Sequence, residues 1–150
     1  MNKFIFAAIT EARKGVKLNH GGPFGAVIVH NGKIISTAHN EVVKTNDPTA
    51  HAEINAIRNA AKKLKTFDLS GCVIYTTCEP CPMCLAAICW ANINKFYHGC
   101  TAADAAKIGF RDKKIYSIVR GSGIPSEQMH RNECLVEFAK WRRMKGRVLY

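Results

Sequence analysis

Residues 72–90 read CVIYTTCEPCPMCLAAICW, and they combine a buried strand with the beginning of a helix. The first six residues, CVIYTT, are apolar and rich in β-branched and aromatic types, which is typical of a buried strand. Pro82 suits the first turn of a helix, so we expect a helix from there to about Trp90 or Ala91. The cysteines of this strand–loop–helix unit, beyond the one that opens it, are Cys78, Cys81, Cys84 and Cys89.

The segments on either side predict a mixed sheet. The pattern predicts four further helices, over 2–17, from an N-cap at Thr49 to about residue 63, near 102–108 and over 132–145. It also predicts three further strands, at 24–29, 34–38 and 93–99. A turn at 30–33 joins the first two strands as a hairpin, whereas the later half alternates strand, helix and strand, which favours parallel pairing. We therefore expect an α/β fold, a three-layer α/β/α sandwich with a mixed central sheet of about five strands.

Length and composition indicate one ordinary domain, residues 1–150, with a 47% hydrophobic fraction. The apolar run at 1–9 is too short for a transmembrane helix and lacks a cleavage pattern, so no membrane partner is expected. The seven cysteines are odd in number and clustered, unlike the framework of a secreted disulfide-rich protein. We expect a cytoplasmic protein with reduced thiols.

The chain is basic, with 22 Lys and Arg against 11 Asp and Glu and a net charge of +11. Such a balance is compatible with a nucleic-acid partner, with anionic substrates or simply with a well-solvated surface. The basic residues are spread along the chain apart from one dense patch at 140–147. Charge alone leaves these classes open.

Two helices are expected to begin with metal-binding chemistry. The first begins TAHAEI, which places His51 and Glu53 near its start, and the second begins EPCPMC, with Cys81 and Cys84. If the two N-termini face each other, one imidazole and two thiolates converge, a set that zinc prefers and that leaves a fourth position open. Glu53 would then lie beside the metal as a proton shuttle. An H-x-E motif followed by P-C-x-x-C is the signature of zinc deaminases that act on nucleobases.

Other interpretations of these cysteines are a closed structural zinc site with Cys78 as a fourth ligand, or a redox pair in CPMC. Both leave Glu53 without a task. We therefore interpret Cys78 as a small buried residue and expect packing roles for the others. These other cysteines are Cys72, Cys89, Cys100 and Cys134.

The sequence resembles the bacterial guanine deaminases of the cytidine deaminase superfamily over residues 1–120 and at the last residue. The blocks that carry the resemblance are GGPFGAVIV (21–29), NDPTAHAEINAIR (46–58), YTTCEPCPMCLAAICWA (75–91) and DAAKIGFRDKKIY (104–116). The first three blocks recur among related deaminases, including those acting on tRNA adenosine. The fourth block and the C-terminal tyrosine favour the guanine deaminases.

The resemblance implies a cytidine deaminase-like fold with one Zn²⁺ per subunit, held by His51, Cys81 and Cys84. Zinc-bound hydroxide would attack C2 of guanine while Glu53 shuttles protons, releasing xanthine and ammonia in purine salvage or catabolism. The expected partners are a purine substrate and a second subunit, in a homodimer that exchanges C-terminal segments of about 120–150. The residues implied to contact substrate are Asn40, Phe24, Asp112 and, from the partner subunit, Tyr150; Trp90 is a further candidate that lines the pocket or packs beneath it.

Three alternatives remain open at this point. Guanosine deaminase would use the same chemistry on a nucleoside, and only a closed C-terminal lid would exclude ribose. A tRNA adenosine deaminase is favoured by the charge of +11 but not by the fourth block. A structural zinc or redox module would be non-enzymatic, and it would not use Glu53.

Overall fold

A single sheet of four strands organises the part of the chain that the computed structural model describes, residues 2–120, 128–143 and 145. Its order is β2-β1-β3-β4; the strands are β1 (Gly25–His30), β2 (Lys33–His39), β3 (Cys72–Cys78) and β4 (Phe96–Cys100). β1 pairs antiparallel with both β2 and β3, whereas β3 and β4 are parallel. The expected mixed sheet is confirmed, with an antiparallel hairpin at one edge and a β-α-β crossover at the other.

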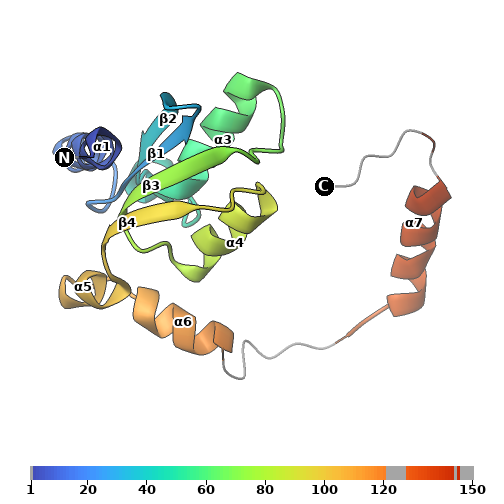
Figure 1. The fold of residues 1–150 in the computed structure, drawn as a ribbon. Helices are drawn as coiled ribbons and strands as arrows, with labels where there is room; N and C mark the ends of the chain where they lie inside the picture. Colours follow the sequence, from blue (N-terminus) through green and yellow to red (C-terminus); the bar gives the residue numbers. More distant parts are fainter. Residues whose placement is uncertain (1, 121–127, 144, 146–150) are drawn as a thin grey trace.

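Helices cover both faces of this sheet, which gives the expected three layers (Figure 1). α1 lies on one face, and α3 and α4 lie on the other. α5 and α6 follow β4 near one end of the sheet. The helices are α1 (Lys3–Lys17), α2 (Val42–Thr45), α3 (Ala52–Leu64), α4 (Pro82–Trp90), α5 (Ala102–Lys107), α6 (Asp112–Arg120) and α7 (Arg131–Arg143).

The core follows the period of two along the central strands. Ile28 and Ile74 face α3 and α4, whereas Val27 and Tyr75 face α1, so β1 is buried on both sides. Gly25 lets α1 approach closely, because a Cβ there would lie 2.0 Å from the backbone oxygen of Ala8. The sheet therefore sits rigidly between its helical layers, with the loops after β2 and β3 at one end.

The starts of α3 and α4 correct the sequence-based capping prediction. Thr49 is not the N-cap of α3; its backbone N–H and hydroxyl both donate to Asp47, which closes a turn before the helix. His51 takes the N-cap position instead, and α3 begins at the next residue. Cys81 is likewise the N-cap of α4, with Pro82 at the first helical position as predicted.

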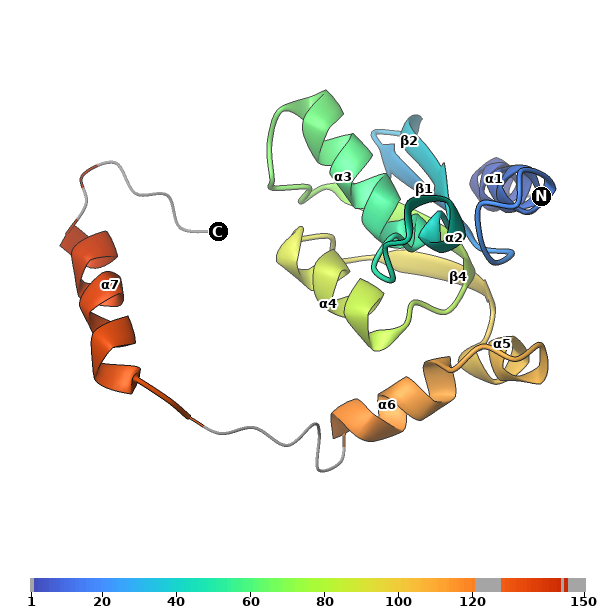
Figure 2. The ribbon, with the colours of Figure 1, turned by 180° about the vertical axis from the view of Figure 1, so that it is seen from behind.

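The last third of the chain differs more from the prediction. Four strands, rather than about five, are present in residues 2–120, 128–143 and 145, and they lie at the four segments where the sequence places strands; α6, after α5, is a helix that the sequence pattern did not predict. The expected C-terminal helix is present as α7, which stands away from the sheet and its covering helices (Figures 1 and 2). Among the described residues, no helix has the length and apolarity needed to cross a membrane.

Candidate active site

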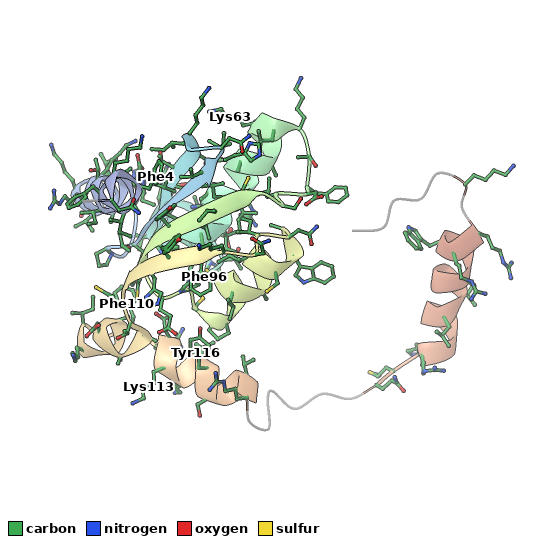
Figure 3. The ribbon with its side chains drawn as sticks, viewed as in Figure 1. Phe4, Lys63, Phe96, Phe110, Lys113 and Tyr116 are labelled. Atoms are coloured by element: carbon green, nitrogen blue, oxygen red, sulfur yellow. The ribbon has the colours of Figure 1, made fainter. Side chains whose placement is uncertain are left out.

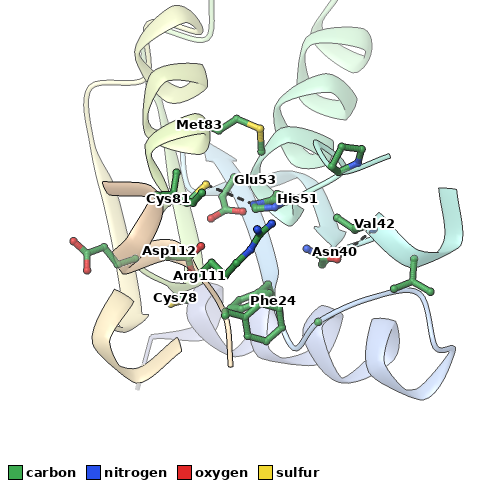
Figure 4. A pocket seen from close by; sticks show the side chains of 16 residues that line it. Phe24, Asn40, Val42, His51, Glu53, Cys78, Cys81, Met83, Arg111 and Asp112 are labelled. Atoms are coloured by element: carbon green, nitrogen blue, oxygen red, sulfur yellow. Dashed lines mark hydrogen bonds between the residues drawn. The ribbon is translucent and has the colours of Figure 1, made fainter. Parts of the chain in front are cut away.

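The N-termini of α3 and α4 bring together one imidazole and two thiols, as the sequence predicts. The Nδ1 atom of His51 lies 3.6 Å from the Sγ atoms of both Cys81 and Cys84, and all three ligand atoms lie within 4.8 Å of one another. Figure 4 shows His51 and Cys81 of this set. Zinc bonds of about 2.0–2.1 Å to nitrogen and about 2.3 Å to sulfur, at tetrahedral angles, separate such atoms by about 3.6 Å. The donor set and its spacing therefore fit a zinc ion with one open position.

The interaction between the two thiols shifts their pKa values in opposite directions. A hydrogen bond from Cys84 lowers the pKa of Cys81 to about 4, and the same bond raises the pKa of Cys84. The pKa of His51 is raised, chiefly by its hydrogen bond to Cys81. Because zinc binds thiolates and neutral imidazole, metal binding here would release protons.

Glu53 lies beside these ligands without belonging to the cluster (Figure 4). It is the second residue of α3, and only 7% of it is exposed. Burial raises the pKa of its carboxyl to about 7, whereas a neighbouring zinc ion would oppose that rise. A carboxyl of this kind can accept and return a proton near neutral pH.

His51 and Cys81 of the cluster line a cleft of about 510 Å³, a size typical of small-molecule sites. Phe24 packs edge-on against Phe110 at 4.6 Å between ring centroids and forms one apolar wall. The lining comprises Gly22, Phe24, Asn40, Val42, Val43, Pro48, His51, Glu53, Cys78, Glu79, Cys81, Met83, Phe110, Arg111, Asp112 and Ile115. The predicted residues Phe24, Asn40 and Asp112 thus share one cavity with the metal cluster.

Asn40 is held firmly at the edge of this cleft. It is 4% exposed, its backbone N–H donates to the oxygen of Phe24, and its side-chain oxygen accepts from the N–H of Val42 at 3.2 Å. Gly21 allows this position, because a Cβ there would lie 2.1 Å from the Asn40 side-chain oxygen. The Asn40 amide is therefore fixed before any ligand arrives.

The wall opposite Asn40 comes from the segment that leads into α6. Asp112 opens that helix, and burial raises the pKa of its carboxyl. Arg111 extends into the cleft toward His51 (Figure 4). The hydroxyl of Tyr116, on α6, donates to the backbone oxygen of Pro80 at 2.6 Å and so ties this segment to the loop before Cys81 (Figure 3).

Sequence reasoning did not identify Arg111 or Phe110. In the run GFRDKK a charged side chain is typical of a solvated surface, and no local pattern marks which one turns inward. Trp90 is not among the described residues that line the cleft: its side chain is 66% exposed, at the far end of α4 from Cys81, and its contact with substrate stays a prediction. The helix carries Trp90 away from the cleft by about 1.5 Å per residue. Tyr150 lies outside the described residues.

The remaining cysteines are only partly as expected. Cys78 is buried, its thiol donates to the backbone oxygen of Thr101 at 3.5 Å, and burial raises its pKa to about 12. It is not a member of the ligand cluster found among the described residues, although it borders the cleft. Cys72 is buried as predicted. Cys89 and Cys100 are exposed in this chain, which contradicts the prediction that they pack in its interior. The side chain of Cys134 lies outside the described residues.

The chain is similar to known zinc-binding deaminases. Residues 1–100 match the family model of the cytidine and deoxycytidylate deaminase zinc-binding region. The chain is 44% identical to guanine deaminase from Bacillus subtilis, over 98% of this chain and 97% of the relative. It is 46% identical to tRNA-specific adenosine deaminase from Aquifex aeolicus, over 61% of this chain and 60% of the relative.

Solved structures of two guanine deaminases also resemble this chain. A crystal structure of guanine deaminase from Bacillus subtilis matches with a TM-score of 0.93 and 44% identity, over 100% of this chain and 99% of that one. A structure of guanine deaminase from Nitrosomonas europaea matches with a TM-score of 0.68 and 32% identity, over 71% of this chain and 62% of that one. The first match extends over α5, α6 and α7 as well as the sheet.

Proposed function

The chain belongs to the family of cytidine and deoxycytidylate deaminases that share a zinc-binding region, and we propose that it is a guanine deaminase, which hydrolyses guanine to xanthine and ammonia. One observation carries the substrate assignment. The family model ends at residue 100, whereas the likeness to guanine deaminase covers 98% of the chain. The cleft residues Phe110, Arg111 and Asp112 lie in that continuation.

Each residue of the metal cluster has a defined part in this proposal. His51, Cys81 and Cys84 would hold one zinc ion, which would supply Lewis-acid activation of the attacking water. Glu53 takes the proton that the water gives up and passes it to the ring nitrogen beside C2. It then takes the proton of the hydroxyl group now on C2 and delivers it to the amine, so that the C2–N bond breaks, the C2 carbonyl of xanthine forms and ammonia leaves as a neutral molecule.

The cleft walls match the chemistry of guanine. Phe24 and Phe110 contact the faces of the ring, and the carboxylate of Asp112 accepts hydrogen bonds from its N–H groups. The guanidinium of Arg111 donates to acceptors such as the carbonyl oxygen, and Asn40 offers both a donor and an acceptor. Buried polar partners of this kind reject analogues that lack the matching group.

We also propose that the single domain works as a homodimer that exchanges C-terminal segments, including Tyr150. Two features support this. All five residues of the edge strand β4 are exposed, among them Tyr97 and Phe96 (the latter labelled in Figure 3), and α7 stands away from the body of its own chain (Figure 1). A partner would cover such surfaces.

Light scattering should give the mass of two chains, and removing Tyr150 should lower activity on guanine. A monomer would contradict the exchange. A cytoplasmic location stays a prediction.

Two other substrates are worth testing. The net charge of +11 and the similarity to tRNA-specific adenosine deaminases favour a tRNA substrate, and guanosine would need only room for ribose. Zinc-loaded protein should be incubated with guanine, guanosine, adenosine-containing tRNA and cytidine while ammonia release is measured. We expect release from guanine. Turnover of tRNA with none of guanine would overturn the proposal.

The role of Glu53 has a separate test. Glu53→Gln keeps the shape of the side chain but cannot carry the proton, so turnover of guanine should fall by at least roughly 10²-fold. Zinc content, measured by elemental analysis, should remain equal to that of the wild type. Full activity in this variant would show that the proton shuttle is another group.

A further inference from the structure

A second cluster of metal-binding side chains lies outside the zinc cluster. His20, in the loop after α1, meets His39 at the end of β2 and Glu41 just beyond it. We propose that His20, His39 and Glu41 form a second metal site that binds a divalent transition-metal ion. This proposal rests on the geometry of these side chains and does not depend on the proposed function.

The spacing of the three ligand atoms fits one ion. His20 Nδ1 lies 2.9 Å from His39 Nε2, and Glu41 Oε1 lies 3.7 Å from each of them. The centre of such a triangle is about 2.0 Å from every corner, which is the length of a zinc bond to imidazole nitrogen or carboxylate oxygen. An ion just out of this plane would keep an open side for water. Two imidazoles and one carboxylate suit zinc, iron, cobalt or nickel better than magnesium or calcium.

Glu11 supplies the outer contact that metal-binding histidines usually have. Its carboxylate lies 3.0 Å from His39 Nδ1, so this ring nitrogen carries the proton and Nε2 keeps its lone pair for a metal. His20 Nδ1 must then be the donor in the bond between the two rings. On metal binding its proton would move to His20 Nε2, so both rings would bind as neutral imidazoles.

Lys44 competes with a metal for this site. Its ammonium group donates a hydrogen bond to Glu41 and satisfies that carboxylate when no ion is bound. The Lys44 side chain is 47% exposed and can turn into solvent, whereas His39 is 9% exposed and stays in place. Metal affinity is therefore set by competition between an ion and this ammonium group.

The position of the cluster links it to the cleft. His39 and Glu41 flank Asn40 in the chain, and His20 precedes Gly21, which packs against the Asn40 side chain. The backbone oxygen of His20 also accepts from the N–H groups of Val43 and Lys44. A bound ion would clamp these loops together and hold the Asn40 wall of the cleft.

Cobalt titration of the protein with zinc already bound at the first cluster tests this site. We expect one further equivalent of Co²⁺ per chain, with d–d absorption but without the charge-transfer bands that a cysteine ligand produces. His20→Gln and His39→Gln should each abolish this equivalent and leave zinc at the first cluster. His98→Gln, which changes an exposed histidine of β4, should retain both. Glu11→Gln should weaken cobalt binding by roughly 10- to 100-fold.

Lys44→Met should change the affinity for cobalt in the opposite direction to the histidine variants, an effect that misfolding would not produce. Removing the competing ammonium group should tighten cobalt binding. Absence of a second equivalent in both the parent protein and Lys44→Met would overturn the proposal. So would thiolate charge-transfer bands, or a second equivalent that persists when His20 and His39 are both replaced.

Discussion

The cleft has two sides that are built differently. The metal side consists of His51, Glu53, Cys81 and Cys84, and the recognition side consists of Phe110, Arg111 and Asp112. The metal side comes from the first turns of two helices that pack on each other and on the sheet, and most of it is buried. The recognition side comes from a segment outside the three layers, and its residues are half-buried or exposed. Under the proposed function, the core would fix the reaction chemistry, whereas this outer segment would contribute to substrate selection.

The largest effect should follow from a change on the metal side. Cys84→Ala removes a zinc ligand, so the ion and its several kcal/mol of catalytic stabilisation should be lost, and turnover of guanine should fall by at least roughly 10³-fold. Elemental analysis should show about one zinc per chain less than in the wild type. Cys89→Ala, an exposed cysteine on the same helix, should keep both zinc and activity. If Cys84→Ala kept as much zinc as the wild type, Cys84 would not be a zinc ligand, and the contrast between a metal side and a recognition side would fail.

Burial on the metal side should also appear in stability. In zinc-free protein the pKa of Glu53 is raised from 4.5 to about 7 by burial, so the folded state binds more protons than the unfolded state between these values. The contribution of Glu53 to stability is therefore full at pH 4.5 and falls as pH rises toward 7, by on the order of 3 kcal/mol. The measurement is urea unfolding of zinc-free wild type and Glu53→Gln across this range. Parallel stability curves for the two proteins would contradict the burial argument.

A change on the recognition side should leave the metal in place. Asp112→Asn removes a charged acceptor for the N–H groups of guanine, so kcat/KM should fall by roughly 10- to 100-fold with zinc content unchanged. Asp68→Asn, on an exposed loop, is the matched control and should behave as wild type. Loss of zinc in Asp112→Asn would mean that this carboxyl supports the metal side.

Arg111 should give the smallest effect. Arg111→Ala removes one donor from an exposed part of the cleft, so KM for guanine should rise by roughly 10-fold while kcat changes little. Steady-state kinetics separate the two parameters. A fall in kcat with KM unchanged would place Arg111 in the reaction step and not in recognition.

The same division explains how far the sequence could predict the site. Each half of the metal side occupies a few consecutive residues at a helix start, so HAE and CPMC reveal it together with the strand between them. Its geometry is then fixed by helix packing, and the fit of three ligands to one ion follows. The resemblance also pointed to Asp112 and Asn40, both of which line the cleft.

The sequence did not predict the location of side chains whose orientation is set by tertiary contacts. Trp90 belongs to the same apolar run as Cys84, but the helix carries it away to an exposed end. Arg111 sits in a charge run, and only the tie from Tyr116 to Pro80 shows that this segment closes over the cleft. The second cluster, with His20 and His39 nineteen residues apart, has no local motif at all.

The separation of α7 from the body that holds the cleft has a genetic consequence. If C-terminal segments are exchanged, the metal residues and the final tyrosine of one chain serve different cleft sites. A chain with Cys84→Ala and a chain lacking Tyr150 would each be inactive as homodimers. Mixed dimers of the two would contain one cleft with both an intact zinc site and an intact donated terminus. Co-expression of two defective alleles would then restore activity that neither allele provides alone.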